Sequence, residues 1–271
     1  MARVIASNVC VRRLPRTEPR RAPLRRLSDL ALGSEGRVVG ILPHCRGIQR
    51  RRLLDLGLIP GTLVKAELHA GAGGPYAYRI KLMADQIHEL FGFDADNLED
   101  FILASQISQA EAKKFFIEVT RSKKWRRTGV IWWNIIDGWP QFSDAVVSYD
   151  FIKKLAYHYI KRSQQDVCLM IAEPESWHVR VLAGNDTLKA AQGTFRVWDA
   201  DSGETLAGGA FEAPANETTE VAAIRVSHGD HRLFLIEWTI GGVRQVNHYV
   251  LGKPPLSFER YKGWLKQIAA L

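Results

Sequence analysis

The period of the hydrophobic pattern changes twice along this chain, near residue 81 and again near residue 163. These two changes limit the possible folds of the chain more than any other feature of its sequence. The first part has short alternating runs, which predict strands with one buried face at 36–42, 62–68 and 75–80. The middle part has helical spacing around one continuous apolar run, and the last part returns to evenly spaced alternation. We therefore expect a multidomain α+β chain, because one regular architecture cannot satisfy all three patterns.

Most of the net charge is carried by the first 26 residues. They contain eight Arg and the single Glu18, which is +7 of the chain's formal +8. A basic arm without interleaved aromatic residues is typical of a solvated tail. We expect residues 1–26 to be a disordered arm, and we expect no nucleic-acid partner.

Apolar runs and cysteines argue for a cytoplasmic protein. No run approaches the roughly 20 apolar residues of a membrane span, so no span is expected. Cys10, Cys45 and Cys168 lie far apart and form no CxxC pair, which argues against a disulfide framework and a structural zinc site.

The first globular part is predicted at residues 27–80. A short helical pattern over 47–56 ends at Gly57, and Ile59-Pro60-Gly61 suits a tight turn. Strand, short helix, turn and strand follow one another, and Lys81–Leu90 reads as a further helix.

The segments LSDLALGSEGRVVGIL and GIQRRRLLDLGLIPGTLVKAELHA resemble the FeoA family. Leu54, Gly57, Pro60 and Gly61 fall where that family has its arginine-leucine helix and its Leu-Gly-Leu-Ile-Pro-Gly-Thr turn. The resemblance implies a small β-barrel of the Src-homology-3 type and a role as a partner of a FeoB-like ferrous-iron transporter in the membrane. Family members close the barrel with one more strand, where this chain has the helical pattern after residue 80.

Two groups of candidate site residues lie in this part. The predicted partner-binding surface comprises Arg50, Arg51, Arg52, Leu54, Gly57, Pro60 and Gly61. The alternative for its arginines is a solvated helix face. His44, Cys45 and His69 are soft ligands suited to a divalent transition metal ion, although their spacing matches no metal motif; no other cofactor is expected.

The middle and last parts give clear element boundaries. Asn97 is expected to cap a helix running toward residue 125, followed by a fully buried strand at 129–136 and a helix at 151–161. Strands are predicted at 167–171, 178–182, 194–198, 221–226, 232–239 and 243–251, with Gly241-Gly242 as a hairpin turn. Ser257 is expected to cap a closing helix.

The segments QAEAKKFFIE, KWRRTGVIWWNIIDGWPQFSDAVV, FIKKLAYHYIKRSQQ, VWDADSGE and LFLIEW are similar to the C-terminal part of beta-mannosidase-like enzymes of glycoside hydrolase family two. The resemblance implies that 81–162 is a truncated remnant of a (β/α) barrel and that 163–271 is an immunoglobulin-like β-sandwich with a closing helix. It also implies that Trp132, Trp133 and Trp139 are a remnant of sugar contacts.

Catalysis is not expected. The family takes both catalytic carboxylates from earlier barrel strands, which would precede residue 81, where this chain has the FeoA-like part. Retaining glycosidases need two such carboxyl groups. Asp137, Asp144 and Asp150 are better explained as turn and capping carboxylates.

Three readings of function follow. The first is an FeoA-like module that takes part in ferrous iron or other transition metal ion handling through protein contact and carries a non-catalytic glycosidase fragment. The second is a carbohydrate-active fragment with residual sugar or interdomain binding, and the third is a fusion reading frame without joint function. Because barrel partners would be missing, we expect residues 81–160 to be the weakest region and to promote self-association.

Overall fold

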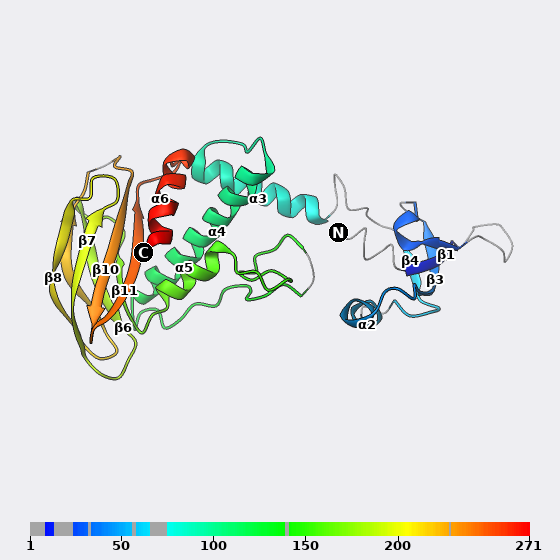
Figure 1. Cartoon of the computed structure of the whole chain (residues 1–271), viewed down its shortest axis with the longest axis horizontal. Coiled ribbons are helices and arrows are strands. Elements are labelled where there is room, and N and C mark those ends of the chain that lie inside the picture. The colour runs from blue at the N-terminus through cyan, green and yellow to red at the C-terminus, as the bar shows by residue number, and fades with distance from the viewer. Residues whose placement is uncertain are drawn as a thin grey trace. The chain divides into compact units, whose positions relative to one another are not determined.

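A computed structural model describes residues 9–13, 24–31, 34–55, 58–65, 75–138, 141–227 and 229–271. The chain divides into two compact units, one of Met1–Leu82 with Pro140–Ser143 and one of Met83–Trp139 with Asp144–Leu271. The α+β class is confirmed, since a small sheet, several helices and an antiparallel sandwich follow one another (Figure 1).

The small unit is built on an antiparallel sheet of order β2-β1-β3-β4. Its strands are β1 (Val9–Arg13), β2 (Leu24–Arg26), β3 (Glu35–Ile41) and β4 (Leu63–Lys65); a 3-10 turn η1 (Leu27–Asp29) and helix α2 (Gly47–Asp55) complete it. Alternate residues of β3 point inward, and the core contains Val11, Leu30, Val38, Cys45 and Leu53.

The expectation of a disordered arm is wrong for two segments of residues 1–26. Strands β1 and β2 lie there, and β1 pairs with β3 so that Val11 sits opposite Val38 inside the core. The short Val-Cys-Val alternation is difficult to detect among the many arginines. Strand β1 forms because the backbone N–H and C=O groups of β3 need hydrogen-bond partners.

The strand predicted at 75–80 is also wrong. These residues begin helix α3 (Pro75–Phe91), and Pro75 occupies its first position, where a missing N–H leaves no intrahelical bond unmade. The helical pattern expected after residue 80 therefore starts six residues earlier.

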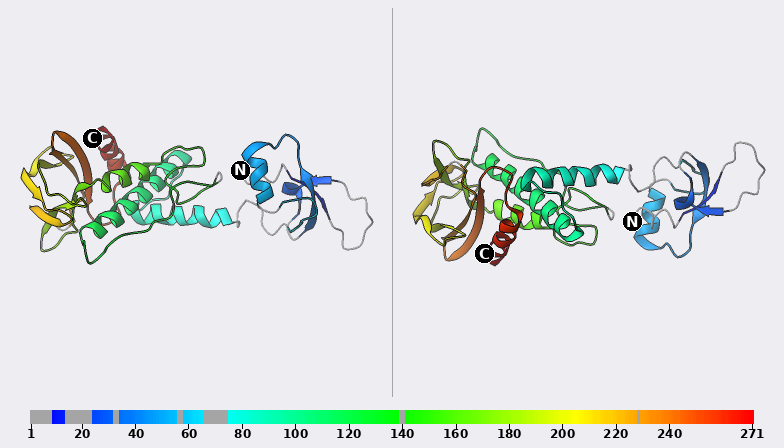
Figure 2. Two further views of the ribbon diagram at one scale, coloured as in Figure 1. Left: turned by 90° about the horizontal axis from the view of Figure 1, so that it is seen from below. Right: turned by 90° about the horizontal axis from the view of Figure 1, so that it is seen from above.

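The described part of the larger unit has a layer of helices: the part of α3 after residue 82, α4 (Leu98–Arg121), α5 (Leu155–Ser163) and α6 (Phe258–Ala270). Both predicted caps are confirmed. Asn97 accepts a hydrogen bond from the backbone N–H of Asp100 at 2.9 Å, and Ser257 accepts one from Arg260 at 3.2 Å. Figure 2 shows these helices gathered on one side of the sandwich.

Two antiparallel sheets make the sandwich, with orders β11-β10-β7-β8 and β5-β6-β9. The strands are β5 (Val167–Ile171), β6 (His178–Asn185), β7 (Ala191–Asp199), β8 (Thr205–Ala213), β9 (Thr218–Arg225), β10 (Arg232–Ile240) and β11 (Val243–Leu251). The Gly241-Gly242 hairpin is confirmed by the pairing of Ile240 with Val243. Strand β8 was not expected, because Gly208 and Gly209 weaken its strand pattern.

Strand β10 is buried on both faces. Phe234, Ile236 and Trp238 enter the core between the two sheets, whereas Leu233 and Leu235 enter a second core with the helices. The expectation that the helices lack packing partners is therefore wrong. The boundary predicted between 162 and 163 stays a prediction.

The buried strand predicted at 129–136 is wrong. This segment forms only an isolated bridge from Ile136 to Val147, and Ile131, Trp133 and Ile135 are exposed. Val130 and Trp132 pack against the helical core. A run that is apolar on both faces needs cover on both faces, and the described chain covers one.

Candidate functional site

The turn Ile59–Thr62 is held by hydrogen bonds from three directions. Within it, the backbone N–H of Thr62 donates to the carbonyl of Ile59 at 3.0 Å, and Gly61 has φ +99°. The N–H of Gly61 donates to the carbonyl of Val38 at 2.8 Å. From the side, the Arg37 guanidinium donates to the Gly61 carbonyl at 2.8 Å. Arg37 thus fixes the turn onto β3.

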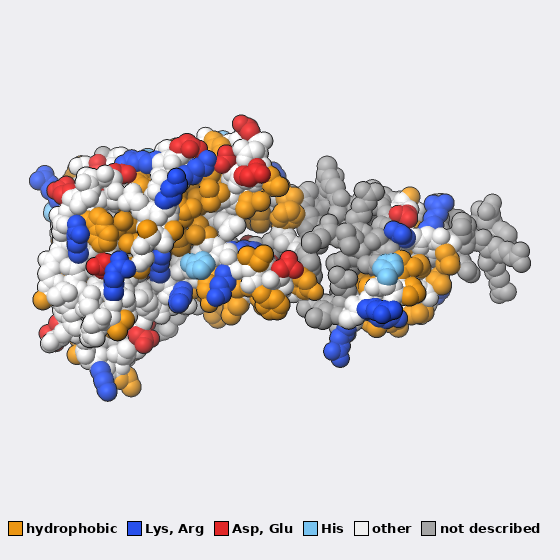
Figure 3. All heavy atoms as spheres, in the orientation of Figure 1, with side chains coloured by type: hydrophobic (Ala, Val, Ile, Leu, Met, Phe, Trp, Pro, Cys, Tyr) orange, Lys and Arg blue, Asp and Glu red, His pale blue; other side chains and the backbone are white. Residues whose placement is uncertain are grey.

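Apolar side chains flank this arginine. Leu63 lies directly opposite Arg37 in the strand register and is 54% exposed, and Ile59 is 51% exposed. We call Arg37, Ile59, Pro60, Gly61 and Leu63 the clipped turn. Figure 3 shows hydrophobic and Lys or Arg side chains next to one another on the described surface of this unit. A guanidinium between exposed aliphatic groups suits an acidic and partly apolar protein surface.

The structure places the predicted partner-binding residues around this turn and on α2. Pro60 and Gly61 are exposed within the turn, and Leu54 is exposed on α2. Arg50 donates to the Ile41 carbonyl at 3.5 Å, and Arg51 is exposed. The Arg52 side chain and Gly57 lie outside the described residues.

Sequence reasoning missed Arg37, Ile59 and Leu63. For Arg37 a signal exists, because alternation in Glu35–Ile41 places it on the face opposite the buried Val38. Its contact with Gly61 bridges 24 positions and could not be read from the sequence.

The predicted metal ligands are not assembled by the described residues. Cys45 is buried in the small core, His44 is exposed, and His69 lies outside the described residues. Within the described ranges, no group of three or more His, Cys, Asp or Glu side chains could hold a metal ion. Metal binding by this unit stays a prediction.

Lys113 holds two of the three predicted sugar-contact residues. Its ammonium lies 4.9 Å from the centre of the Trp132 ring and donates to the Trp133 carbonyl at 2.8 Å. The Trp133 side chain is exposed, and Trp139 lies outside the described residues. Of the aspartates, Asp137 is buried with Lys154 at 3.5 Å, whereas Asp144 and Asp150 are exposed.

A buried polar junction joins α4 to the sandwich, and the sequence analysis did not find it. Lys114 and Glu118 form an ion pair at 2.8 Å with both side chains buried. Glu118 also accepts hydrogen bonds from Ser163 of α5 at 3.1 Å and from Asn247 of β11 at 2.8 Å. The signal was a Lys and a Glu four positions apart on an otherwise apolar helix face.

A second contact of this junction contains a histidine. His248 of β11 is buried, and its Nε2 lies 3.0 Å from Oε1 of Glu111, which also accepts a hydrogen bond from Tyr261. Burial lowers the pKa of His248. Burial alone would raise the pKa of Glu111, but His248, Lys114 and Tyr261 lower it overall. His248 is therefore a neutral N–H donor to a carboxylate at pH 7.

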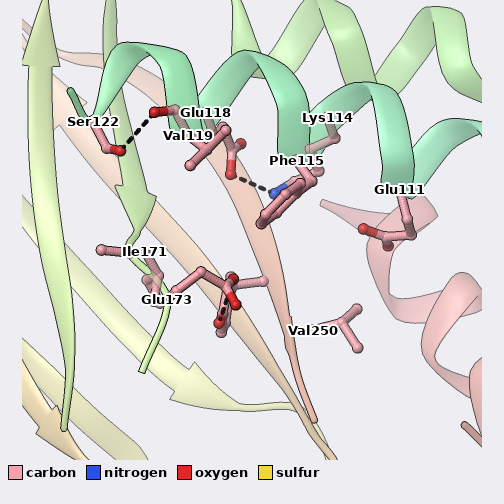
Figure 4. Close-up of a pocket in the computed structure, with 11 residues that line it drawn as sticks. Glu111, Lys114, Phe115, Glu118, Val119, Ser122, Ile171, Glu173 and Val250 are labelled. Carbon is pink, nitrogen blue, oxygen red and sulfur yellow. Dashed lines mark hydrogen bonds and ion pairs between the residues drawn. The ribbon is translucent and has the colours of Figure 1, made fainter. Parts of the chain in front are cut away.

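Beside the junction lies a cavity of about 80 Å3 (Figure 4). Its polar lining includes Glu111, Lys114, Glu118 and Glu173, and Glu173 accepts a hydrogen bond from Tyr249 at 3.3 Å. Because these groups all have partners within the fold, the junction is suited to holding the helices on the sheet.

The comparisons with known proteins match the two parts of the chain to different families of proteins. The FeoA domain profile matches residues 25–87, which include β3, α2 and β4 and reach into α3. Within the described residues, no helix is long and apolar enough to cross a membrane.

The rest of the chain is similar to glycosidases. Beta-mannosidase B of Thermothelomyces thermophilus is 30% identical over 159 residues, which is 48% of this chain and 18% of that protein. The beta-D-mannosidase structure from Dictyoglomus thermophilum matches with a TM-score of 0.57 and 23% identity, over 66% of this chain and 23% of that one. The Amycolatopsis orientalis exo-chitosanase matches with a TM-score of 0.47 and 20% identity, over 63% of this chain and 21% of that one. This chain thus spans less than a quarter of the two mannosidases.

Proposed function

We propose that the small unit is a protein-binding module in the handling of ferrous iron or another transition metal ion, and that the clipped turn is its contact surface. The observation that carries this proposal is that Arg37, paired with the exposed Leu63, is hydrogen bonded to the turn that carries the exposed Ile59. The FeoA profile covers all of these residues. Side chains that are apolar, exposed and held by a hydrogen-bonded turn lose little entropy on binding.

The proposed partner is a FeoB-like transporter, contacted from the cytoplasm. An acidic segment of such a protein could pair with the free N–H groups of a guanidinium, while its apolar groups cover Ile59 and Leu63. Arg50 and Arg51 would extend the same basic surface along α2.

A binding measurement with matched leucine variants tests this proposal. Leu63 and Leu188 are both exposed leucines, but Leu188 lies in the other unit. We expect Leu63→Arg to weaken capture of a FeoB-like transporter at least tenfold and Leu188→Arg to leave it unchanged. Equal capture by both variants would remove the clipped turn from the contact surface.

We further propose that the glycosidase-like part is not catalytic. Asp137 is already paired with Lys154, and the similarity to mannosidases covers a small share of their length. Release of nitrophenol from mannoside, galactoside and glucuronide substrates should stay at the background rate. Turnover that is lost in Asp137→Asn or Asp144→Asn would identify a catalytic carboxylate and contradict the proposal.

A further inference from the structure

The turn over residues 148–152 presents two large apolar side chains to solvent. The N–H of Ser148 donates to the Ile152 carbonyl, and the N–H of Phe151 donates to the Ser148 carbonyl, both at 2.9 Å. The N–H of Ile152 donates to the Ser148 hydroxyl at 3.1 Å. This closed turn leaves Phe151 78% and Ile152 66% exposed.

Opposite charges stand on either side of this apolar pair. Asp150 precedes Phe151, Lys153 follows Ile152, and both charged residues are exposed. The Lys153 ammonium lies 4.8 Å from the centre of the Tyr157 ring. The order along the chain is therefore acid, apolar, apolar, base, and we call residues 150–153 the DFIK segment.

More exposed apolar groups belong to the same layer. Residues around Val147 are hydrogen bonded on one side to 135–137 and bridged on the other to Lys153, so Ile135 and Ile152 lie about two strand spacings apart, roughly 10 Å. Ile135 is 66% and Trp133 76% exposed. Together with Phe151 and Ile152, these side chains are exposed apolar groups of segments that are hydrogen bonded to one another.

The size of this surface is suited to an interface. Burial removes about 150–250 Å2 for each aromatic side chain and on the order of 100 Å2 for each isoleucine. Phe151, Ile152, Ile135 and Trp133 therefore offer roughly 500–700 Å2 per copy, against the ~800 Å2 that each partner buries in a standard interface.

We propose that this surface binds a second copy of the chain, with two DFIK segments antiparallel about a two-fold axis. In that arrangement Asp150 faces Lys153 of the partner subunit, and Phe151 faces Ile152 of the partner subunit. Both ion pairs form at once, as a two-fold interface requires. A uniformly acidic or basic partner would satisfy one charge and repel the other. This inference uses the larger unit alone and does not depend on the proposed function.

Charge exchange in the full chain tests the arrangement by sedimentation velocity. Wild type should form a dimer, while Asp150→Lys and Lys153→Asp should each weaken it at least tenfold, because like charges then face each other. The variant with both substitutions exchanges the two charges and should recover dimerisation to within about threefold. Mixing the two single variants should restore association between them.

Glu204→Lys serves as a control for a changed net charge, since Glu204 is exposed on the sandwich; it should leave the dimer unchanged. Phe151→Ser should abolish the dimer while the far-UV circular dichroism spectrum remains native. A wild-type monomer at 100 µM would overturn the proposal. So would association that is lost in the single variants and not regained on mixing or in the double variant.

Discussion

At the scale of single residues, the clipped turn depends on a backbone conformation that suits glycine. Gly61 has φ +99°, a region that L-residues with a Cβ rarely adopt. No heavy atom lies within 4 Å of a Cβ built on Gly61, so space is not what excludes a side chain. The requirement is conformational, and it lies at the residue that both Arg37 and Val38 contact.

We therefore expect Gly61→Ala to destabilise the small unit by about 1–2 kcal/mol, the cost of the left-handed region for a residue with a Cβ. Gly40→Ala is the matched control, because Gly40 lies in β3 without a positive φ and with equal space. All eight tryptophans lie between Trp125 and Trp264, so hydrogen exchange at Val38 should be measured instead of fluorescence. Equal protection in both variants would contradict this expectation.

His248 should make the larger unit less stable in acid. Its pKa is lowered in the fold by burial, and Nδ1 has no hydrogen-bond partner among the described residues. Between the two pKa values the unfolded chain therefore binds more protons than the folded chain. The free energy of unfolding is highest above about pH 6.5, the ordinary pKa of histidine, and it falls as the pH decreases toward the lower pKa of the folded state.

Urea unfolding at pH 7 and pH 5, followed by tryptophan fluorescence, measures this dependence. His248→Gln should reduce the difference between the two pH values. His158 also has a lowered pKa, through burial and the nearby Arg162, Lys153 and Lys161, so His158→Gln gives the comparison. A pH dependence that is unchanged in His248→Gln would assign the effect to other groups.

At the scale of elements, Glu118 links three of them. It joins α4, which carries it, to Ser163 at the end of α5 and to Asn247 in the middle of β11. Its charge is balanced by Lys114 one helical turn away. A buried pair of this kind gives position and orientation more than net stability.

Removing one member of the pair should be costly. We expect Glu118→Leu to lower the free energy of unfolding by about 3–5 kcal/mol, because the buried Lys114 then loses its hydrogen-bonded ion-pair partner. The double variant Lys114→Met, Glu118→Leu should recover much of this loss. Urea titrations of the single and double variants give the coupling between the two residues; additive losses would mean that they do not act as a pair.

At the scale of the whole molecule, the helices and the sandwich of the larger unit depend on each other. Leu233 and Leu235 of β10, Ile107 and Ile117 of α4, and Trp264 of α6 belong to one buried hydrophobic cluster. The exposed segment around Trp133 is a local feature of this unit and does not make its helices unstable.

A fragment 163–271 should therefore be less stable and less soluble than a fragment 83–271. Removing α3, α4 and α5 uncovers several buried aliphatic and aromatic side chains, each contributing about 1.5–3 kcal/mol. Thermal melts and light scattering of both fragments test this. A shorter fragment that melts higher and stays monomeric would show that the sandwich carries its own stability.

Local patterns in the sequence were sufficient for much of the larger unit. Asn97, Ser257 and the Gly241-Gly242 turn act through neighbours within a few positions, and six of the sandwich strands overlap the evenly spaced apolar runs that predicted them. Strand β8 was not predicted because its glycines weaken the strand pattern. Strand β1 was not predicted because arginines surround its apolar residues. In both cases hydrogen bonding to a neighbouring strand, β3 for β1 and β7 for β8, gives the segment its strand conformation.

By itself, the sequence determined the two changes of architecture, the caps, the hairpin and the resemblance of each part to a known family, because these depend on residue types close together in the chain. The tertiary structure alone decided that Arg37 fixes the Gly61 turn, that Glu118 and His248 connect the helices to the sandwich, and that one face of 129–136 is uncovered. Those contacts join positions from 24 to 137 residues apart. The packing of the buried faces determines which distant residues come into contact, and the local spacing of residue types does not predict these contacts.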